Sequence, residues 1–187
     1  MEFETLETER LLLKKLTPES FEYLSQNYSE EDIISLLGLT NHTDFIREKE
    51  KSQGGYKTYD RTIVAFLIIS KTSGNTIGRC GFHNWYVDHN KAEIGYVIYD
   101  EKNRKQGYMI EAITAIIDYG FNVMNLNRIE ACTSPDNTAS LHIIEKFGFK
   151  REGYLRQHFA IDGKLEDTLI FSLLRIEFET KSTAKKV

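Results

Sequence analysis

The spacing of apolar residues divides the N-terminal third of the chain into one strand and several helices. A first strand is predicted over residues 9–15. The pair Thr17-Pro18 favours a helix start, because threonine suits the N-cap position and proline the first helical turn. This helix is expected to end near Asn27, and one or two more are predicted within residues 29–53.

Three consecutive strands are predicted in the middle of the chain. Residues 62–70 are rich in β-branched and aromatic side chains, and the polar cluster at residues 72–75 is typical of a turn. The chain is then expected to return over residues 76–85 and again over residues 91–99. The pattern therefore predicts a meander of three strands.

A helix, a strand and a short helix are predicted next. Four apolar residues recur at helical spacing, so residues 107–121 are expected to form an amphipathic helix; they are Ile110, Ile113, Ile117 and Phe121. Residues 127–133 are predicted to return as a strand. Asn137 is then expected to cap a helix that ends at Gly148, because glycine is favoured just after a helix.

The C-terminal pattern predicts a hairpin followed by a frayed tail. Residues 153–161 and 165–174 are predicted strands joined by Asp162-Gly163, which is a strong turn pair. Residues 177–187 are expected to be frayed, which leaves one domain over residues 1–176. The order of elements predicts a mixed α+β fold in which only the unit around residues 107–121 needs a parallel crossover.

Composition then narrows the class of protein. The chain has 187 residues, of which 41% are hydrophobic and 28% charged, and this suits one globular domain. The longest apolar run, residues 63–69, is too short to span a bilayer, and the acidic start has no signal-peptide pattern. Cys80 and Cys132 lie in apolar runs and are interpreted as buried thiols of a reducing compartment, so a cytoplasmic location is expected.

Charge points to one local anion-binding segment. A net charge of -4 gives no global positive field for nucleic acid, so a polyanion would have to be bound by a local group of residues. Residues 103–109 lie between a predicted strand and a predicted helix and include Arg104, Lys105 and Gly107. A helix N-terminus offers unpaired N–H groups, and glycine lets a phosphate approach them. A solvated basic loop is the alternative interpretation. The segment is neither a Walker A loop nor a Gly-x-Gly-x-x-Gly fingerprint, which argues against NTPases and dehydrogenases.

Further segments, in order along the chain, accompany this loop. They are Thr8-Glu9-Arg10-Leu11-x-Leu13, Ala92-Glu93-Ile94-Gly95-Tyr96, Gly107-Tyr108-x-x-Glu111-Ala112, Asn127-Arg128-Ile129-Glu130-Ala131, Asn137-x-x-Ser140-x-x-Ile143-x-Glu145-Lys146-x-Gly148-Phe149 and Glu152-Gly153-x-Leu155-Arg156. Together with the loop Arg104-x-x-Gly107-x-Met109, the chain resembles the GNAT N-acetyltransferase superfamily, and within it the RimJ/RimL-like branch. The family prefers Gly or Ala where this chain has Met109. The resemblance implies a GNAT fold, with a mostly antiparallel twisted sheet of about seven strands, a splayed parallel pair and about four helices.

The resemblance also implies a site for acetyl-CoA, as the acyl donor. No metal site is expected, because the five histidines and two cysteines show no ligand spacing. The pantetheine arm is expected in the gap between the splayed strands, along the backbone of Val97, Ile98 and Tyr99. The remaining implied cofactor-binding residues are Arg104, Lys105, Gln106, Gly107, Tyr108, Met109, Asn137 and Ser140.

Glu93 and Ser140 are the candidate catalytic residues. A carboxylate in an apolar strand is costly unless it has a role or a partner. Glu93 is therefore expected to act as a general base or to bind the amine, unless it pairs with Arg79 or Lys91 or is solvated. The resemblance implies that Ser140 hydrogen-bonds the departing sulfur, unless its hydroxyl is satisfied by its own helix. Many family members carry a tyrosine acid four residues later, where this chain has Ile144.

The acceptor site is predicted from residues at strand ends. They are His83, Asn84, Trp85, Tyr154 and Arg156, with His158 on the same hairpin face, although an ordinary sheet face would show the same pattern. An α-amine with a pKa near 8 is about a tenth neutral at pH 7, whereas a lysine amine is neutral about once in a few thousand. An α-amine or a small-molecule amine is therefore the preferred acceptor.

The function predicted from the sequence is N-acetyl transfer from acetyl-CoA to a primary amine. The acceptor is either a protein N-terminus, ribosomal or other, or a small-molecule amine, and the protein is a monomer or a homodimer. No nucleic-acid or membrane partner is expected. The alternatives are a non-catalytic acyl-CoA-binding sensor or scaffold, and a dimeric interaction protein with a vestigial phosphate loop.

Overall fold

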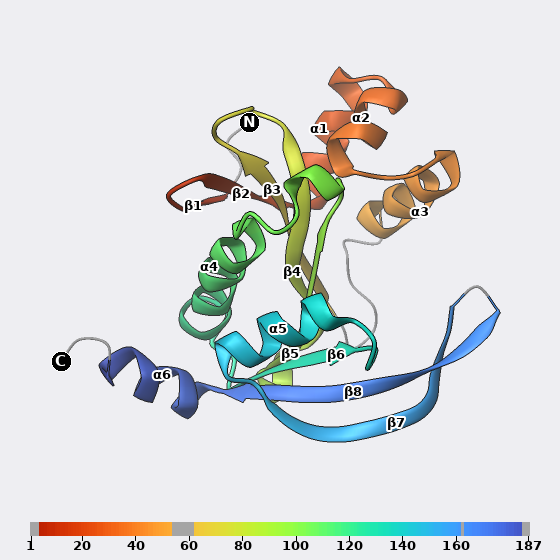
Figure 1. Ribbon diagram of the computed structural model, residues 1–187. Coiled ribbons are helices and arrows are strands. Elements are labelled where there is room, and N and C mark those ends of the chain that lie inside the picture. Colours follow the sequence, from red (N-terminus) through yellow and green to blue (C-terminus); the bar gives the residue numbers. More distant parts are fainter. Residues whose placement is uncertain (1–3, 54–61, 162, 185–187) are drawn as a thin grey trace.

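The computed structural model describes residues 4–53, 62–161 and 163–184 (Figure 1). Eight strands of this part form one sheet in the order β1-β2-β3-β4-β5-β6-β8-β7. The strands are β1 (Thr5–Glu7), β2 (Leu11–Leu16), β3 (Thr62–Ser70), β4 (Thr76–Tyr86), β5 (Lys91–Ile98), β6 (Arg128–Thr133), β7 (Lys150–Ile161) and β8 (Lys164–Leu174). The helices are α1 (Pro18–Asn27), α2 (Glu30–Leu37), α3 (His42–Gln53), α4 (Tyr108–Asn122), α5 (Thr138–Phe147) and α6 (Arg175–Ala184), with short 3-10 turns η1 (Val87–His89) and η2 (Glu101–Asn103).

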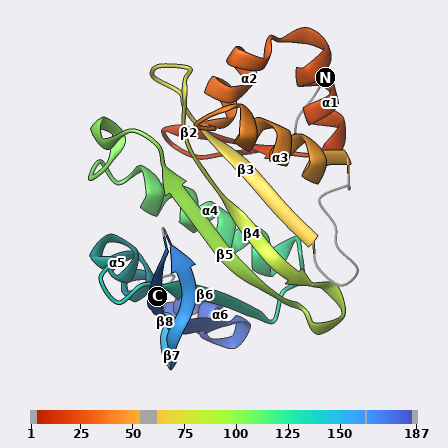
Figure 2. The same cartoon turned by 90° about the vertical axis from the view of Figure 1, so that its right-hand side faces the viewer.

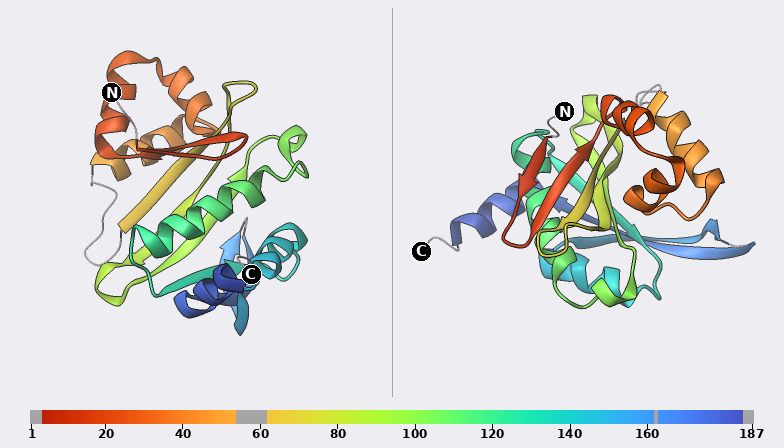
Figure 3. Two further views of the ribbon diagram at one scale, coloured as in Figure 1. Left: turned by 90° about the vertical axis from the view of Figure 1, so that its left-hand side faces the viewer. Right: turned by 90° about the horizontal axis from the view of Figure 1, so that it is seen from above.

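Helices cover both faces of this sheet, with α4 on one face and α1–α3 on the other (Figures 1 and 3). Alternation along β3 explains the two layers, because successive side chains of a strand point to opposite faces. Phe66 and Ile68 are fully buried in the cluster that contains the residues of α4. Ala65 and Leu67 are buried in a second cluster with residues of α1, α2 and α3.

The sheet divides where β5 meets β6, its one parallel pair of strands among the described residues. Pairing runs from Lys91 opposite Arg128 to Glu93 opposite Glu130, and it ends there. Beyond this point β5 continues only against β4, while β6 continues against β8. Figure 2 shows β3–β5 running in one direction and β6, β8 and β7 in another. A gap between the two strands follows directly from this divergence.

The predicted helix start at Thr17 is confirmed by a reciprocal cap. The Thr17 hydroxyl oxygen accepts the N–H of Ser20 at 3.2 Å, and the Ser20 hydroxyl oxygen accepts the N–H of Thr17 at 2.8 Å. Two of the N–H groups at this helix end are satisfied in this way. The predicted turn at Asp162 lies outside the described residues.

The mixed α+β class and the splayed parallel pair are confirmed, and the structure differs from the prediction in three details. The described sheet has eight strands rather than about seven, because Thr5–Glu7 pairs with β2, and the described residues form six α-helices rather than about four. The chain is also helical to Ala184, where a frayed tail was expected from residue 177. Phe178 explains the difference, since its ring stacks on Phe121 of α4 with 4.9 Å between centroids. The boundary of a single domain at residue 176 stays a prediction.

None of the described helices has the length and apolar character needed to cross a bilayer.

Candidate functional site

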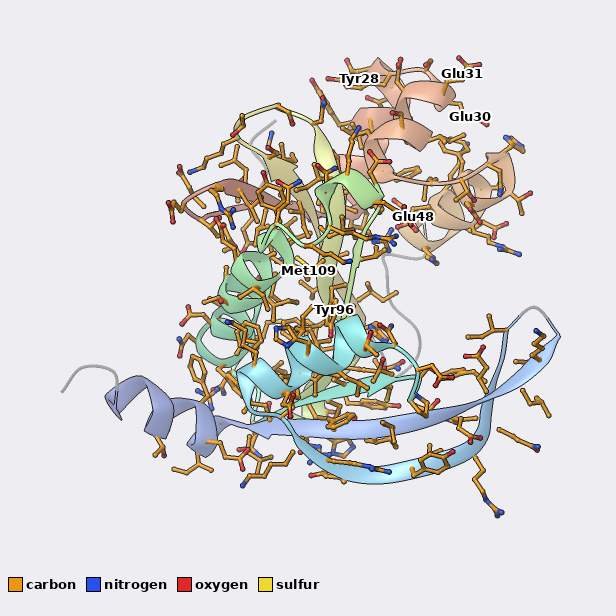
Figure 4. All side chains as sticks on the ribbon, in the orientation of Figure 1. Tyr28, Glu30, Glu31, Glu48, Tyr96 and Met109 are labelled. Atoms are coloured by element: carbon orange, nitrogen blue, oxygen red, sulfur yellow. The ribbon has the colours of Figure 1, made fainter. Side chains whose placement is uncertain are left out.

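A cleft of about 1220 Å³ lies where β5 and β6 diverge. Its walls come from β5, the loop before α4, the first turns of α4 and α5, the end of β6, and the β7–β8 hairpin. Figure 4 shows Tyr96 and Met109 in the space between α4 and α5. The cleft brings together most of the residues predicted from the sequence, and both helices that border it do so with their N-terminal ends.

The loop at one end of the cleft exposes backbone amides. Gly107 is the N-cap of α4 with φ +80°, and no side chain of the described residues caps the helix there. Lys105 also has a positive φ, of +58°. The first N–H groups of an α-helix have no partner within the helix, so those of this turn remain available to a ligand. Arg104 and Lys105 line the same end of the cleft and add two positive charges.

Glu111 fixes this loop against the start of β2. Its carboxylate accepts the Arg10 N–H at 2.7 Å, the Arg10 Nε at 2.6 Å and the Thr8 hydroxyl at 2.6 Å. Arg10 also donates from Nη1 to the Gln106 carbonyl oxygen at 3.0 Å. Burial raises the pKa of Glu111, but these hydrogen bonds outweigh it and hold the pKa below its usual value. The segment around Arg10 and the segment around Glu111, both of which resemble family segments, therefore contact each other and position the loop.

A carboxylate and an imidazole meet at the other end of the cleft. His83 Nε2 lies 3.2 Å from Glu93 Oε1, and Asn84 Nδ2 donates to Glu93 Oε2 at 2.9 Å. Burial raises the pKa of Glu93, whereas the contacts with His83, Asn84 and Cys132 lower it, and the net direction is downward. Glu93 is therefore a carboxylate at neutral pH.

The pairing of Glu93 with Arg79 or Lys91, considered from the sequence, is wrong. Arg79 lies 3.6 Å from the buried Glu48, and Lys91 lies 3.4 Å from Glu130. His83 takes that place because it stands directly opposite Glu93 in the β4–β5 register.

Ser140 lies at the start of α5, as predicted. The Asn137 side-chain oxygen accepts the Ser140 N–H at 3.1 Å, which confirms Asn137 as the helix cap. The Ser140 hydroxyl lies 2.8 Å from the hydroxyl of Tyr96 on β5. Burial raises the pKa of Tyr96 above its ordinary value, although the contact with Ser140 lowers it.

Tyr96 was not among the residues predicted for the site. It occurs in the shared segment from Ala92 to Tyr96, and its place three residues after Glu93 puts it on the opposite face of the strand. This alternation of side chains along the strand is the sequence signal that could have pointed to Tyr96. Its contact with Ser140 joins two elements 44 residues apart and could not be derived from local spacing.

Several predicted site residues do not line the cleft. The Tyr99 side chain anchors α2, since its hydroxyl donates to the Leu37 carbonyl oxygen at 2.6 Å, and the contact expected of the Tyr99 backbone stays a prediction. Trp85 packs against the main core, and Asn84 reaches the cleft only through Glu93. The Gln106 side chain donates to the Lys102 carbonyl oxygen, outside the lining of the cleft.

Tyr154 and Arg156 line a separate hollow along β7, together with His158. The alternation assumed for this strand is interrupted by a register shift between Leu155 and Phe159, where Gln157 has φ +51°. The hairpin residues that reach the main cleft instead are Phe159, Ile161, Glu166, Asp167 and Thr168. Cys132 also lines the cleft and is half-buried, so the prediction that both cysteines are buried holds only for Cys80.

Charge is separated along the cleft. Arg104, Lys105 and the N-terminus of α4 make the loop end positive. Glu93 is negative on β5 away from this loop, and Glu166 and Asp167 add negative charge from the hairpin wall of the cleft. Such an arrangement suits an anionic group at one end and a cationic group at the other.

Comparison with known proteins gives a consistent result. Residues 10–150 match the family described as "Acetyltransferase (GNAT) domain". The chain is 36% identical over 176 residues to the "Uncharacterized N-acetyltransferase p20" of Bacillus licheniformis, covering 94% of this chain and 98% of that protein. It is 32% identical over 106 residues to the "[Ribosomal protein uS5]-alanine N-acetyltransferase" of Escherichia coli, covering 57% of this chain and 50% of that protein. The crystal structure of a GNAT-family acetyltransferase from Bacillus anthracis superimposes with a TM-score of 0.66 at 28% identity, covering 91% of this chain and 98% of that one.

Proposed function

The chain belongs to the GNAT acetyltransferase family, and we propose that it transfers the acetyl group of acetyl-CoA to a primary amine. The observation that carries this proposal is the charge-separated cleft at the divergence of β5 and β6. Its positive end suits a diphosphate, and its negative end suits a protonated amine that arrives before reaction.

The residues present fit the coenzyme. We call the loop of residues 104–107, together with the first backbone amides of α4, the amide cradle. A side chain at Gly107 would place a Cβ at its mouth, 3.4 Å from Arg10 Nη2, and glycine leaves that space open. Arg104, Lys105 and the first amides of α4 would hold the diphosphate. The edge of β5 beyond Glu93 is not paired with β6, so its backbone can bind an extended amide-containing arm in the manner of an added strand. The bound group would supply an activated acetyl thioester.

Met109 does not prevent this arrangement. The family position is usually smaller, but here the Met109 side chain packs partly against the main core. It also borders the cleft beside Gly107, Tyr108 and Ile110, so it narrows the site without removing these residues from the lining.

His83 and Glu93 would prepare the amine. A carboxylate that holds one ring nitrogen of a histidine leaves the other nitrogen to accept a proton. Glu93 contacts His83 Nε2, and Nδ1 faces the backbone near Gly95, where a Cβ would lie only 3.0 Å away. We assign His83 as the proton acceptor, with Glu93 orienting it and attracting the cationic amine. This assignment refines the sequence-based prediction that Glu93 serves as a general base, directly or through water, or binds the amine.

The acceptor end favours an amine that is accessible and easily deprotonated. An α-amine or a small-molecule amine suits a single imidazole–carboxylate pair, because far less free energy is needed to deprotonate it than a lysine amine. The apolar side chains of Phe159 and Ile161 line the hairpin wall of the cleft, where Phe159 stands opposite Glu166 in the strand register. A peptide N-terminus and a polyamine are both compatible with that combination.

The alternative of a non-catalytic acyl-CoA sensor explains the cradle but gives no role to the groups at the far end. A sensor needs neither the His83–Glu93 pair nor the hydroxyl of Ser140 facing the cleft. Thiol release from acetyl-CoA, followed with peptides bearing a free N-terminus, with polyamines and with no acceptor, separates the two functions.

We expect amine-dependent thiol release, with stoichiometric acetylation detected by mass spectrometry. The His83→Gln variant should lose most turnover while its Kd for CoA stays close to that of the wild type. Tight CoA binding without release for every amine would support the sensor. If neither CoA nor acetyl-CoA raised the Tm of the protein, both functions would be excluded.

A further inference from the structure

The hydroxyl groups of Tyr96 and Ser140 form a pair inside the cleft, with 2.8 Å between the two oxygens. Tyr96 comes from β5 and Ser140 from α5, and both line the cleft. We propose that Tyr96 is a positioning residue for acetyl transfer: its phenol donates to Ser140, so that the Ser140 proton points toward the departing sulfur. This inference rests on the proposed function.

The direction of the hydrogen bond follows from acidity. A phenol has a pKa near 10 and is a much stronger donor than an aliphatic hydroxyl. When the phenol donates, the Ser140 oxygen accepts, and the Ser140 hydrogen is left for another acceptor. The reverse arrangement would direct the Ser140 hydrogen at Tyr96 and leave the sulfur without it.

Ser140 is not turned back into its own helix. Hydroxyls within helices commonly donate to the carbonyl oxygen four residues earlier. Thr114 and Thr180 do so in this protein, at 2.8 Å and 2.7 Å. The hydroxyl of Ser140 has Tyr96 as its hydrogen-bond partner in the described structure, so the interpretation of Ser140 as satisfied by its own helix is not supported.

The two pairs of proton-handling groups stand on opposite faces of β5. Ala92, Ile94 and Ile98 point into the core around α4, and Tyr96 packs against the same core. Glu93 has the opposite parity and pairs with His83. The gap between β5 and β6 connects the two faces, because the same cleft is lined by Glu93 and by Tyr96.

The two pairs of groups account for both proton transfers of the reaction. The amine nitrogen forms a bond to the carbonyl carbon and releases one proton on the His83 side. The carbon–sulfur bond breaks, its electron pair goes to sulfur, and sulfur receives one proton on the Ser140 side. A hydrogen bond from Tyr96 stabilises the Ser140 oxygen while that proton is shared, and hydrogen bonds in a chain strengthen one another. Ser140 keeps its own proton in a hydrogen bond to the thiolate, and the thiolate takes its proton from solvent on that side of the cleft.

A double-mutant cycle tests whether Tyr96 acts through Ser140, an arrangement that we call the relay. We expect Ser140→Ala to lower kcat about 100-fold, as for the loss of a group that assists proton transfer. Tyr96→Phe should lower kcat about 2- to 12-fold, the range for one neutral hydrogen bond. The double variant should be no slower than Ser140→Ala, because Tyr96 acts only through Ser140. In a Ser140→Thr background, which keeps a hydroxyl, the effect of Tyr96→Phe should return.

Controls separate this role from a structural one. Kd for CoA and Tm should stay near the wild-type values in Tyr96→Phe, so that the loss falls on kcat and not on KM. Tyr119→Phe is the matched control, since it removes a hydroxyl that bonds Lys15 outside the cleft, and its kcat should be unchanged.

Multiplied losses in the double variant, or an unchanged kcat in Tyr96→Phe, would overturn the relay while leaving the enzyme assignment intact. A wild-type protein that released no thiol with any amine would overturn both proposals at once.

Discussion

Gly107 offers a sharp test of the amide cradle, because another glycine supplies a matched control. Gly107 has φ +80° and Gly74 has φ +70°, and alanine is strained in both conformations. The Cβ of Gly74→Ala would meet nothing within 4 Å, and Gly74 lies outside the lining of the cleft. Both substitutions therefore carry the same backbone strain, but only one of them alters the proposed diphosphate site.

The magnitudes of the two effects can be separated. A non-glycine residue in the left-handed region costs about 1–2 kcal/mol, so each variant should lose that much unfolding free energy, or about 2–8 °C in Tm for a domain of this size. The Gly107→Ala variant should in addition lose at least one hydrogen bond to a charged phosphate. Such a bond contributes about 1.5–3 kcal/mol, which corresponds to a Kd for CoA that is about 10- to 150-fold higher.

Isothermal titration calorimetry with CoA and urea denaturation of each variant measure the two quantities separately. The expected result is equal destabilisation in both variants with weakened CoA binding in Gly107→Ala alone. If Gly107→Ala and Gly74→Ala bound CoA with the same Kd as the wild type, the diphosphate could not lie on the first turn of α4. That result would exclude the proposed mode of coenzyme binding.

Three other substitutions probe the surroundings of the cleft. Gly95→Ala should lower kcat/KM for the amine more than it weakens CoA binding, because its Cβ would lie 3.0 Å from His83 Nδ1; steady-state kinetics would contradict this if the ratio were unchanged. Glu111→Gln should reduce the unfolding free energy by about 1–2 kcal/mol and raise the Kd for CoA, since the loop loses its charge-assisted contact with Arg10; the urea midpoint and calorimetry measure both effects. Glu152 has a pKa lowered to about 2 by hydrogen bonds from Arg128 and Ser172, so its contribution is present above the unfolded pKa near 4.3 and is lost as the pH falls toward 2. Glu152→Gln should accordingly be less stable by about 0.5–1 kcal/mol at pH 6, a modest amount because the ion pair is solvent-exposed, and the difference should vanish near pH 2.

Local sequence signals predicted the parts of the site that depend on one element. The periodicity of residues 107–121 gives α4, and a glycine before it gives an open helix N-terminus. Asn137 caps α5 and so orients the first turn that carries Ser140. Each of these features depends on residues that lie within about four positions of one another, so the sequence alone predicted them.

Features that depend on contacts between distant elements were missed or misplaced. Tyr99 was predicted only for its backbone, and no local pattern indicated that its hydroxyl would donate to the Leu37 carbonyl oxygen of α2. Helix α6 has weak helical patterning and is held by the contact of Phe178 with Phe121, which lies 57 positions earlier in the sequence. The pairing of Tyr96 with Ser140 depends on the angle at which β5 and α5 meet, and no local pattern encodes that angle.

The spacing of Glu93 and Tyr96 connects the fold to the proposed chemistry. Residues three apart on a strand necessarily face opposite sides of the sheet, and an intact sheet would keep them apart. In this protein the pairing of β5 with β6 stops at Glu93, so the sheet is open between that residue and Tyr96. A thioester in the opening would therefore meet the amine from the Glu93 side and lose its sulfur toward the Tyr96 side. One additional residue between the two would bring both onto one face and reverse every side chain that follows on β5. The divergence of the strands and the odd spacing along β5 are thus two parts of one arrangement, and neither would separate the two proton transfers without the other.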